Sequence, residues 1–259
     1  MTEWIPADDP LPGHRRPGDG ASVVLLHGFT QTGRSWVPVA DALDHSSDLF
    51  APDAPGHGRS SHVPIDITEY AARLASNLPP STWVGYSMGG RTALRVALDH
   101  PERVRSLVLI GATPGIENAA ERADRRAADE KLARHVLESS LDDFLVEWLS
   151  QPLFATLPKA AWNLEDRRRN GREGLASSLR RAGTGAQDSL WSRLGELSCP
   201  TVLITGELDT KFSDIASRMT QLISGPVEHI VVPGNGHAVH LESPTVVASV
   251  VDRVVRRLD

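Results

Sequence analysis

Six short apolar runs, rich in β-branched residues, constrain the fold of this chain more than any other feature. They lie at residues 23–26, 49–51, 82–84, 107–110, 201–204 and 229–232. Most of them lack polar alternation, which is typical of strands buried on both faces in a parallel sheet covered by helices. The stretches between them can form helices, so the sequence predicts a doubly wound α/β fold. The first twenty residues carry little strand signal, and any N-terminal hairpin should be short.

One interval interrupts this alternation of strands and helices. Between Gly111 and Thr201 there is scarcely any β character, residues 117–139 are rich in Ala, Glu and Arg, and apolar anchors continue at helical spacing. A chain of 259 residues lies near the upper limit for one hydrophobic core. We therefore expect a single domain over residues 1–259, with a core formed by 1–113 and 195–259 and a helical lid over about 114–194.

Composition excludes several classes of function. The formal net charge is −6, from 27 Lys and Arg against 33 Asp and Glu, so no general attraction to nucleic acid or to an acidic membrane surface is expected. Cys199 is the one cysteine, which excludes an internal disulfide and favours a reducing compartment. No run approaches 18 apolar residues, and the acidic start is unlike a signal peptide. We expect a cytoplasmic monomer without metal or cofactor.

Residues 85–89 read Gly-Tyr-Ser-Met-Gly and match the G-x-S-x-G pattern. A predicted strand leads in and a predicted helix leads out, as the nucleophile elbow requires. The flanking glycines suit a turn so sharp that a β-carbon would collide with neighbouring backbone. The turn would lift the Ser87 hydroxyl to the carboxyl end of the sheet, beside the positive end of a helix. An accidental Gly-Ser turn is the alternative interpretation.

A serine hydroxyl needs an imidazole to take its proton, and that imidazole needs an acid to orient it. His237 follows the last predicted strand and is preferred to its competitor His240 because of its position. Asp209 lies where the loop after residues 202–205 has turned toward the site, and we prefer it to Glu207. The order Ser87, Asp209, His237 is the order expected of an α/β-hydrolase fold, a mostly parallel sheet flanked by helices.

Residues 27–29, His-Gly-Phe, follow the first strong strand, where this fold supplies a second oxyanion donor. The backbone N–H groups of Phe29 and Met88 would converge on a developing oxyanion. His27, and His57 in the loop after the second strand, are interpreted as buried structural residues.

Over nearly its whole length the chain resembles the 2-succinyl-6-hydroxy-2,4-cyclohexadiene-1-carboxylate synthases of menaquinone biosynthesis. The elbow is shared with many α/β-hydrolases, so the discriminating stretches lie mostly in the predicted lid. They are Gly90-Arg91, Pro114-Gly115-Ile116, Glu121-Arg122 with Arg125, residues 148–154, Asn170, Gly174-Leu175-Ala176, Leu179-Arg180, residues 183–187 and residues 206–212. One departure is the run Arg167-Arg168-Arg169, where the family usually has a single arginine; the spacing selects Arg167 but leaves Arg169 open.

The resemblance implies a lyase that eliminates pyruvate from 2-succinyl-5-enolpyruvyl-6-hydroxy-3-cyclohexene-1-carboxylate, a small polycarboxylate. Arginine holds a carboxylate through two parallel charge-assisted hydrogen bonds. The resemblance assigns that role to Arg91, Arg125 and Arg167, although a lone arginine would more simply be a solvated helix charge. It also implies a pocket lined by Tyr86, Trp148, Gln187 and Trp191. Trp191 could instead lie in the hydrophobic core.

Two other functions remain as alternatives at this point. The first is a serine hydrolase, either a carboxylesterase or a carbon–carbon bond hydrolase, with the same triad. It would have an apolar pocket, and the arginines of the predicted lid argue against it. The second is a non-catalytic binding protein of the same fold, which the complete set of Ser87, Asp209 and His237 disfavours.

Overall fold

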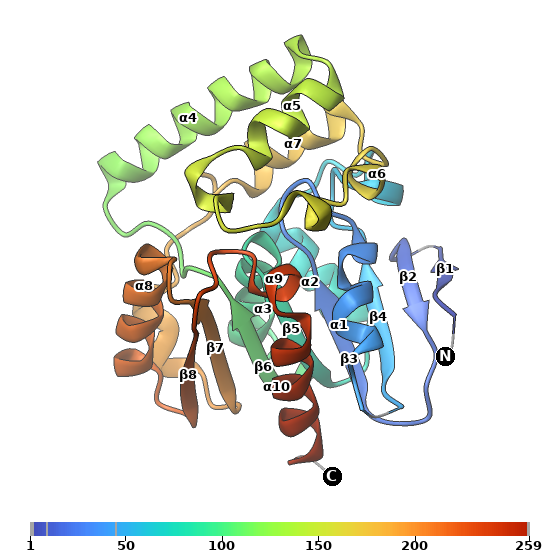
Figure 1. The fold of residues 1–259 in the computed structure, drawn as a ribbon. Coiled ribbons are helices and arrows are strands. Elements are labelled where there is room, and N and C mark those ends of the chain that lie inside the picture. The colour runs from blue at the N-terminus through green and yellow to red at the C-terminus, as the bar shows by residue number, and fades with distance from the viewer. Residues whose placement is uncertain (1–2, 9, 45, 258–259) are drawn as a thin grey trace.

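The computed structural model describes residues 3–8, 10–44 and 46–257, and within them the strands form one sheet (Figure 1). Its order is β1-β2-β4-β3-β5-β6-β7-β8. The strands are β1 (Ile5–Ala7), β2 (Gly13–Arg16), β3 (Ser22–Leu26), β4 (Asp48–Pro52), β5 (Ser81–Tyr86), β6 (Val104–Ile110), β7 (Thr201–Gly206) and β8 (Val227–Val232). All six predicted runs are strands, and the predicted short hairpin is β1–β2.

The pairing within the sheet also follows the prediction of a mostly parallel arrangement. All pairs from β4 to β8 are parallel, whereas β1–β2 and β2–β4 are antiparallel. Every residue of β5 is buried because β5 lies between β3 and β6 with helices over both faces. The expected burial on both faces does not hold for β8, which lies at the edge of the sheet and has mostly half-buried residues.

Helices cover the two faces of the sheet (Figure 1). One face packs against α1 (Val37–Asp41), α9 (Val239–Glu242) and α10 (Pro244–Arg256), and the other against α2 (Ile67–Asn77), α3 (Met88–Asp99) and α8 (Thr210–Leu222). Short 3₁₀ helices lie at Gly33–Trp36, Gly58–Ser60, Pro101–Arg103, Pro152–Phe154, Lys159–Ala161 and Trp191–Glu196. Local sequence sets some of these boundaries. Asp66 caps α2 by accepting the N–H groups of Thr68 and Glu69, and Pro244 begins α10 where a missing N–H costs nothing.

The interval between β6 and β7 is helical, as the sequence predicts. It contains α4 (Ala119–Glu138), α5 (Leu141–Leu149), α6 (Leu164–Arg167) and α7 (Arg172–Ala182). These helices lie over the end of the sheet where the parallel strands finish (Figure 1). They bury a small apolar cluster of their own, centred on Val136, Phe144 and Leu175. The helical segment therefore covers the edge of the sheet at which Ser87 and His237 lie.

Within the described residues, no helix combines the length and apolar character needed to cross a membrane. The same part of the chain contains no cluster of three or more His, Cys, Asp or Glu side chains placed to hold a metal ion.

Candidate active site

The turn between β5 and α3 forces Ser87 into an unusual backbone conformation. Its φ is 50° and its ψ is −107°, a region that non-glycine residues rarely occupy. The turn closes only because its flanks lack side chains. A β-carbon on Gly89 would lie 2.1 Å from the Leu26 carbonyl oxygen, and one on Gly85 would lie 2.4 Å from the Gly89 oxygen. The pattern at residues 85–89 is therefore a nucleophile elbow in three dimensions.

The structure brings Ser87, His237 and Asp209 together in one hydrogen-bonded chain. Ser87 Oγ lies 3.2 Å from His237 Nε2, and His237 Nδ1 lies 2.7 Å from Asp209 Oδ2. His237 is 2% exposed and Asp209 is 7% exposed, so little water competes for the bond between them. This geometry places the proton of the neutral imidazole on Nδ1, donating to the carboxylate, and leaves Nε2 to accept the serine proton.

Glu207 and His240, the alternatives to Asp209 and His237 in the sequence, lie outside the hydrogen-bonded chain. Glu207 accepts a hydrogen bond from the Gly234 N–H at 2.9 Å, away from the imidazole. His240 is buried, its ring lies 4.0 Å from that of Tyr86, and its Nε2 lies 3.1 Å from Gln31 Nε2. Burial is the main cause that lowers the pKa of His240 well below its usual value, so this ring is neutral.

Phe29 and Met88 border the cavity beside Ser87, and the described chain offers no acceptor for the backbone N–H of either residue. Met88 is the first residue of α3, and no preceding helical turn can accept its N–H. The neighbouring N–H groups of Gly28 and Thr30 have acceptors, Gln31 Oε1 at 3.0 Å and His57 Nε2 at 3.2 Å. No acceptor for the Phe29 N–H is found within the described chain. Backbone N–H groups without acceptors beside a nucleophile are what an oxyanion hole requires.

Buried histidines hold the loop that carries Phe29. His57 Nε2 accepts the N–H of Thr30, a residue with a φ of 66°, and His27 Nε2 accepts the N–H of Ala54 at 2.9 Å. Burial lowers the pKa of His57 to about 3, so at neutral pH the ring keeps the lone pair that this bond requires. The structural role predicted for His27 and His57 is confirmed.

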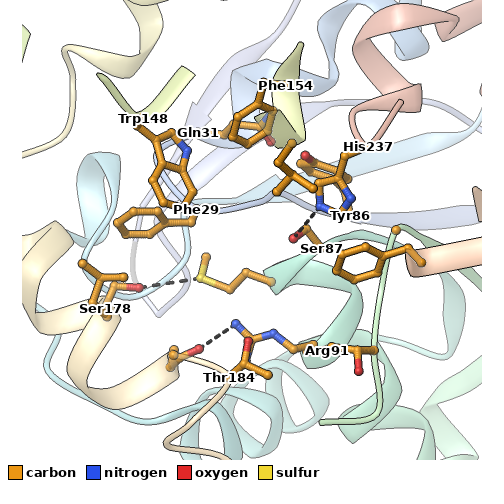
Figure 2. Close-up of a pocket in the computed structure, with 18 of the residues that line it drawn as sticks. Phe29, Gln31, Tyr86, Ser87, Arg91, Trp148, Phe154, Ser178, Thr184 and His237 are labelled. Carbon is orange, nitrogen blue, oxygen red and sulfur yellow. Dashed lines mark hydrogen bonds between the residues drawn. The ribbon is translucent and has the colours of Figure 1, made fainter. Parts of the chain in front are cut away.

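A cavity opens above Ser87 and is bordered by the helical segment (Figure 2). Its aromatic wall is formed by Phe29, Tyr86, Trp148, Phe154 and Phe212, and its cations are Arg91, Arg125, Arg167 and Lys211. No carboxylate is among the described residues that line it. Figure 2 shows Trp148 and Phe154 across the cavity from Arg91. Ser87 lies between them, next to His237. Burial raises the pKa of the Tyr86 hydroxyl, which therefore stays un-ionised.

Arg91 and Arg167 are buried cations with neutral partners. Arg91 is 7% exposed and donates to Gln187 Oε1 at 2.6 Å and to the Ala182 oxygen at 2.7 Å. Arg167 is 3% exposed and donates to the Trp162 oxygen at 2.7 Å and to the Thr30 hydroxyl. No carboxylate pairs with either one within the described chain.

Burial, with a smaller contribution from the Arg125 guanidinium, lowers the pKa of Arg91 to about 10; burial likewise lowers the pKa of Arg167 to about 10. Both side chains are nevertheless charged at neutral pH. Asp129 and Asp166 act on these charges only from a distance, and a buried charge without a direct partner is costly, so the site is suited to an anion that would pair with these arginines.

Unlike Arg91 and Arg167, Arg125 and Arg169 are partly exposed and have carboxylate partners. Arg125 borders the cavity, pairs with Asp129 at 2.8 Å and has a side chain that is 44% exposed. Arg169 does not border the cavity; it lies 3.5 Å from Asp166 with half of its side chain exposed. Of the two candidates that the sequence leaves open, the structure places Arg167 at the cavity and Arg169 outside it.

Two of the residues expected to line the pocket are not on its wall. Gln187 lies behind Arg91 and orients the guanidinium through the bond at 2.6 Å. Trp191 is buried, its Nε1 donates to the Gly115 oxygen at 3.0 Å, and the Arg218 guanidinium lies 3.9 Å from its ring centroid. Trp191 therefore lies in the core, which was the alternative to a place on the pocket wall.

The structure also adds residues to which the sequence gave no role. Gln31, Phe154, Lys211 and Phe212 border the cavity. The Phe212 ring centroid lies 4.5 Å from that of His237 and helps to shield the imidazole. Phe154, Lys211 and Phe212 lie in stretches that carry the family resemblance, which is the one signal that could have identified them.

Comparisons with known proteins agree with this geometry. A family model described as alpha/beta hydrolase fold matches residues 21–244. A Bacillus subtilis (strain 168) protein named putative 2-succinyl-6-hydroxy-2,4-cyclohexadiene-1-carboxylate synthase is 38% identical over 251 residues, which cover 91% of this chain and 90% of that protein. The synthase of that name from Salmonella schwarzengrund (strain CVM19633) is 33% identical, with 96% of both chains covered. The solved structure of MenH from S. aureus superposes with a TM-score of 0.87 at 26% identity, over 100% of this chain and 99% of that one.

Proposed function

Because this chain belongs to the 2-succinyl-6-hydroxy-2,4-cyclohexadiene-1-carboxylate synthase family of the α/β-hydrolase fold, we propose that Ser87, Asp209 and His237 carry out the reaction of that family on it. The enzyme is a carbon–oxygen lyase of menaquinone biosynthesis. It eliminates pyruvate from 2-succinyl-5-enolpyruvyl-6-hydroxy-3-cyclohexene-1-carboxylate and leaves the cyclohexadiene product.

The observation that carries this proposal is the pair of buried arginines, Arg91 and Arg167, without carboxylate partners beside the triad. The substrate has three carboxylates, and Arg125 is the third arginine at the cavity. A simple ester would leave Arg91 and Arg167 without a carboxylate partner, whereas a tricarboxylate would pair with both of them and with Arg125. Arg91, Arg125 and Arg167 are the proposed substrate-binding arginines, with Tyr86 and Trp148 as walls and Gln187 as the support of Arg91.

The proposed mechanism requires neither water nor an acyl-enzyme. His237, oriented by Asp209, makes Ser87 basic enough to remove the ring proton α to the succinyl ketone. The N–H groups of Phe29 and Met88 stabilise the enolate oxygen. The enolate then collapses, and its electron pair moves through the ring double bond to expel the ether oxygen with its three-carbon unit. That unit takes up a proton, which His237 holds, and leaves as pyruvate.

A chain acting on such a substrate would work where the substrate is made. A tricarboxylate crosses a bilayer poorly because its charges are strongly hydrated. We therefore propose cytoplasmic action on a small-molecule substrate. We also propose that the protein acts as a monomer, because residues of one chain supply Ser87, His237, both proposed oxyanion donors and three arginines to the cavity.

A pyruvate-release assay distinguishes this function from that of a serine hydrolase. We expect the purified enzyme to release pyruvate from the pathway substrate with a kcat/KM at least about a hundred-fold above that for a small neutral ester, because only the triacid pairs with the arginines. Equal turnover of both compounds, or ester hydrolysis without pyruvate release, would favour the hydrolase alternative.

We further propose that the helical segment at residues 114–194 is a lid over the core, and expect it to move more than the core when the cavity is empty. Only three of the 20 residues of α4 are buried, and the segment must admit a large anion. Hydrogen exchange should be faster in α4 and α5 than in β5, and saturating product should slow exchange in the lid most. Equal protection of lid and core, with and without product, would contradict this expectation.

A further inference from the structure

The carboxylate of Glu242 binds the backbone on both sides of the triad histidine. Its Oε2 accepts the N–H of Gly236 at 2.8 Å, and its Oε1 accepts the N–H of Ala238 at 3.0 Å. These are the residues immediately before and after His237. Glu242 is the last residue of the short helix α9, and its own N–H donates to the Ala238 oxygen at 3.0 Å. The loop and the helix are thus closed into one hydrogen-bonded unit around His237.

The position of the His237 backbone matters because the imidazole has two partners on different elements. Its Nδ1 must meet Asp209, which follows β7, while its Nε2 must meet Ser87, which follows β5. A small shift of the His237 backbone would lengthen one of the two bonds, and displacements of about 1 Å can cost about a hundred-fold in rate. Two charge-assisted hydrogen bonds from one carboxylate are a rigid way to fix that backbone.

We propose that Glu242 is a positioning residue, which fixes the backbone on both sides of His237 so that the imidazole reaches Ser87 and Asp209 at once. The proposal deepens the proposed function, because it rests on the triad role of His237. Glu242 does not touch the reacting atoms: it is not among the described residues that line the cavity. Only a group with two acceptor atoms can fill this place. A glutamine would keep one acceptor and turn its NH₂ toward the other N–H.

Glu207, which follows β7, provides a matched control because it binds the loop of His237 from a neighbouring loop. Its carboxylate accepts a single backbone hydrogen bond, from Gly234 at 2.9 Å, three residues before His237. Glu207 is exposed, and its replacement by glutamine removes a negative charge but keeps one acceptor for Gly234, so neither neighbour of His237 is freed. Any effect that follows from the loss of a negative charge beside the loop should therefore appear in Glu207→Gln as well.

The test compares Glu242→Gln with Glu207→Gln by two readouts. The first is the rate at which a fluorophosphonate labels Ser87, which needs the triad but neither the arginines nor the pathway substrate. The second is the division of the pyruvate-release rate into kcat and KM. We expect Glu242→Gln to lower the labelling rate and kcat by about ten- to a hundred-fold with KM within about two-fold, and Glu207→Gln to change neither more than about two-fold.

A spectroscopic readout separates positioning from a loss of fold. The low-field proton resonance of the His237–Asp209 hydrogen bond should broaden or vanish in Glu242→Gln and persist in Glu207→Gln, while thermal unfolding shows both variants folded. Should Glu242→Gln not fold, Glu242→Asp carries the same comparison, because its shorter side chain cannot span both N–H groups. Wild-type labelling of Ser87 in a folded Glu242 variant, or equal losses in the Glu207 variant, would overturn the inference. Labelling that falls as expected in a protein that releases no pyruvate would instead count against the proposed function alone.

Discussion

Replacement of Ser87 by alanine should lower pyruvate release by about a hundred- to ten-thousand-fold and leave product affinity within a few-fold of wild type. The rate falls because the group that takes the ring proton is lost, and a positioned base contributes about 10²–10⁴-fold. Affinity persists because the arginines, rather than the serine, bind the carboxylates in the ground state. Steady-state kinetics gives the first quantity, and calorimetric titration of the variant with product gives the second.

Ser178→Ala is a suitable control for this experiment. Ser178 also borders the cavity, but its hydroxyl faces the Met88 sulfur at 3.6 Å rather than His237. Its loss should change kcat less than about three-fold, as expected of a hydroxyl outside the triad. If Ser87→Ala lost binding together with rate, Ser87 would be a ligand-binding group and the proposed proton transfer would be wrong.

The fold was predictable because its determinants are local. Each apolar run from residue 23 onward carries in its own residues the pattern of a buried strand, and the glycines at 85 and 89 permit the sharp turn of the elbow. Chain order then places Asp209 and His237 at the same sheet edge as Ser87, because parallel strands end together. The exposure of β8 was not predictable in this way, because edge position is a property of the whole sheet and not of an apolar run.

Cavity residues were harder to predict because their roles depend on contacts far apart in sequence. Arg167 and Arg169 are the same residue type, two positions apart in the sequence. Only the packing of α6 against Thr30 buries Arg167 and leaves Arg169 beside Asp166. Gln187 likewise reaches the site only through Arg91, which is 96 residues away in sequence. Pattern and resemblance identify such residues as candidates, but tertiary contacts decide which of them touch the cavity.

The arginines separate the synthase from a hydrolase most sharply. Replacement of Arg91 or Arg167 by alanine should cost about 2–4 kcal/mol, or about thirty- to a thousand-fold in kcat/KM for the triacid, because a carboxylate then lies poorly paired in a buried site. Arg125→Ala should fall at the lower end of that range, since its side chain is 44% exposed and already pairs with Asp129. Lysine at each position should restore only part of the loss, because a point charge cannot reproduce a two-pronged contact.

The matched control for Arg167→Ala is Arg169→Ala, which removes the same charge two residues away and outside the cavity. It should leave kcat/KM for the triacid within about two-fold, because the Arg169 side chain is half exposed and the buried Asp166 keeps its bonds from Thr32 and its contact with Arg34. A small neutral ester, if turned over at all, should respond weakly to all of these variants, since it offers no carboxylate to lose. Measurement of both reactions on the same set of proteins is therefore decisive. Equal losses on ester and triacid would mean that the arginines support the fold or the triad instead of the substrate, and no loss on the triacid would remove the tricarboxylate from this cavity.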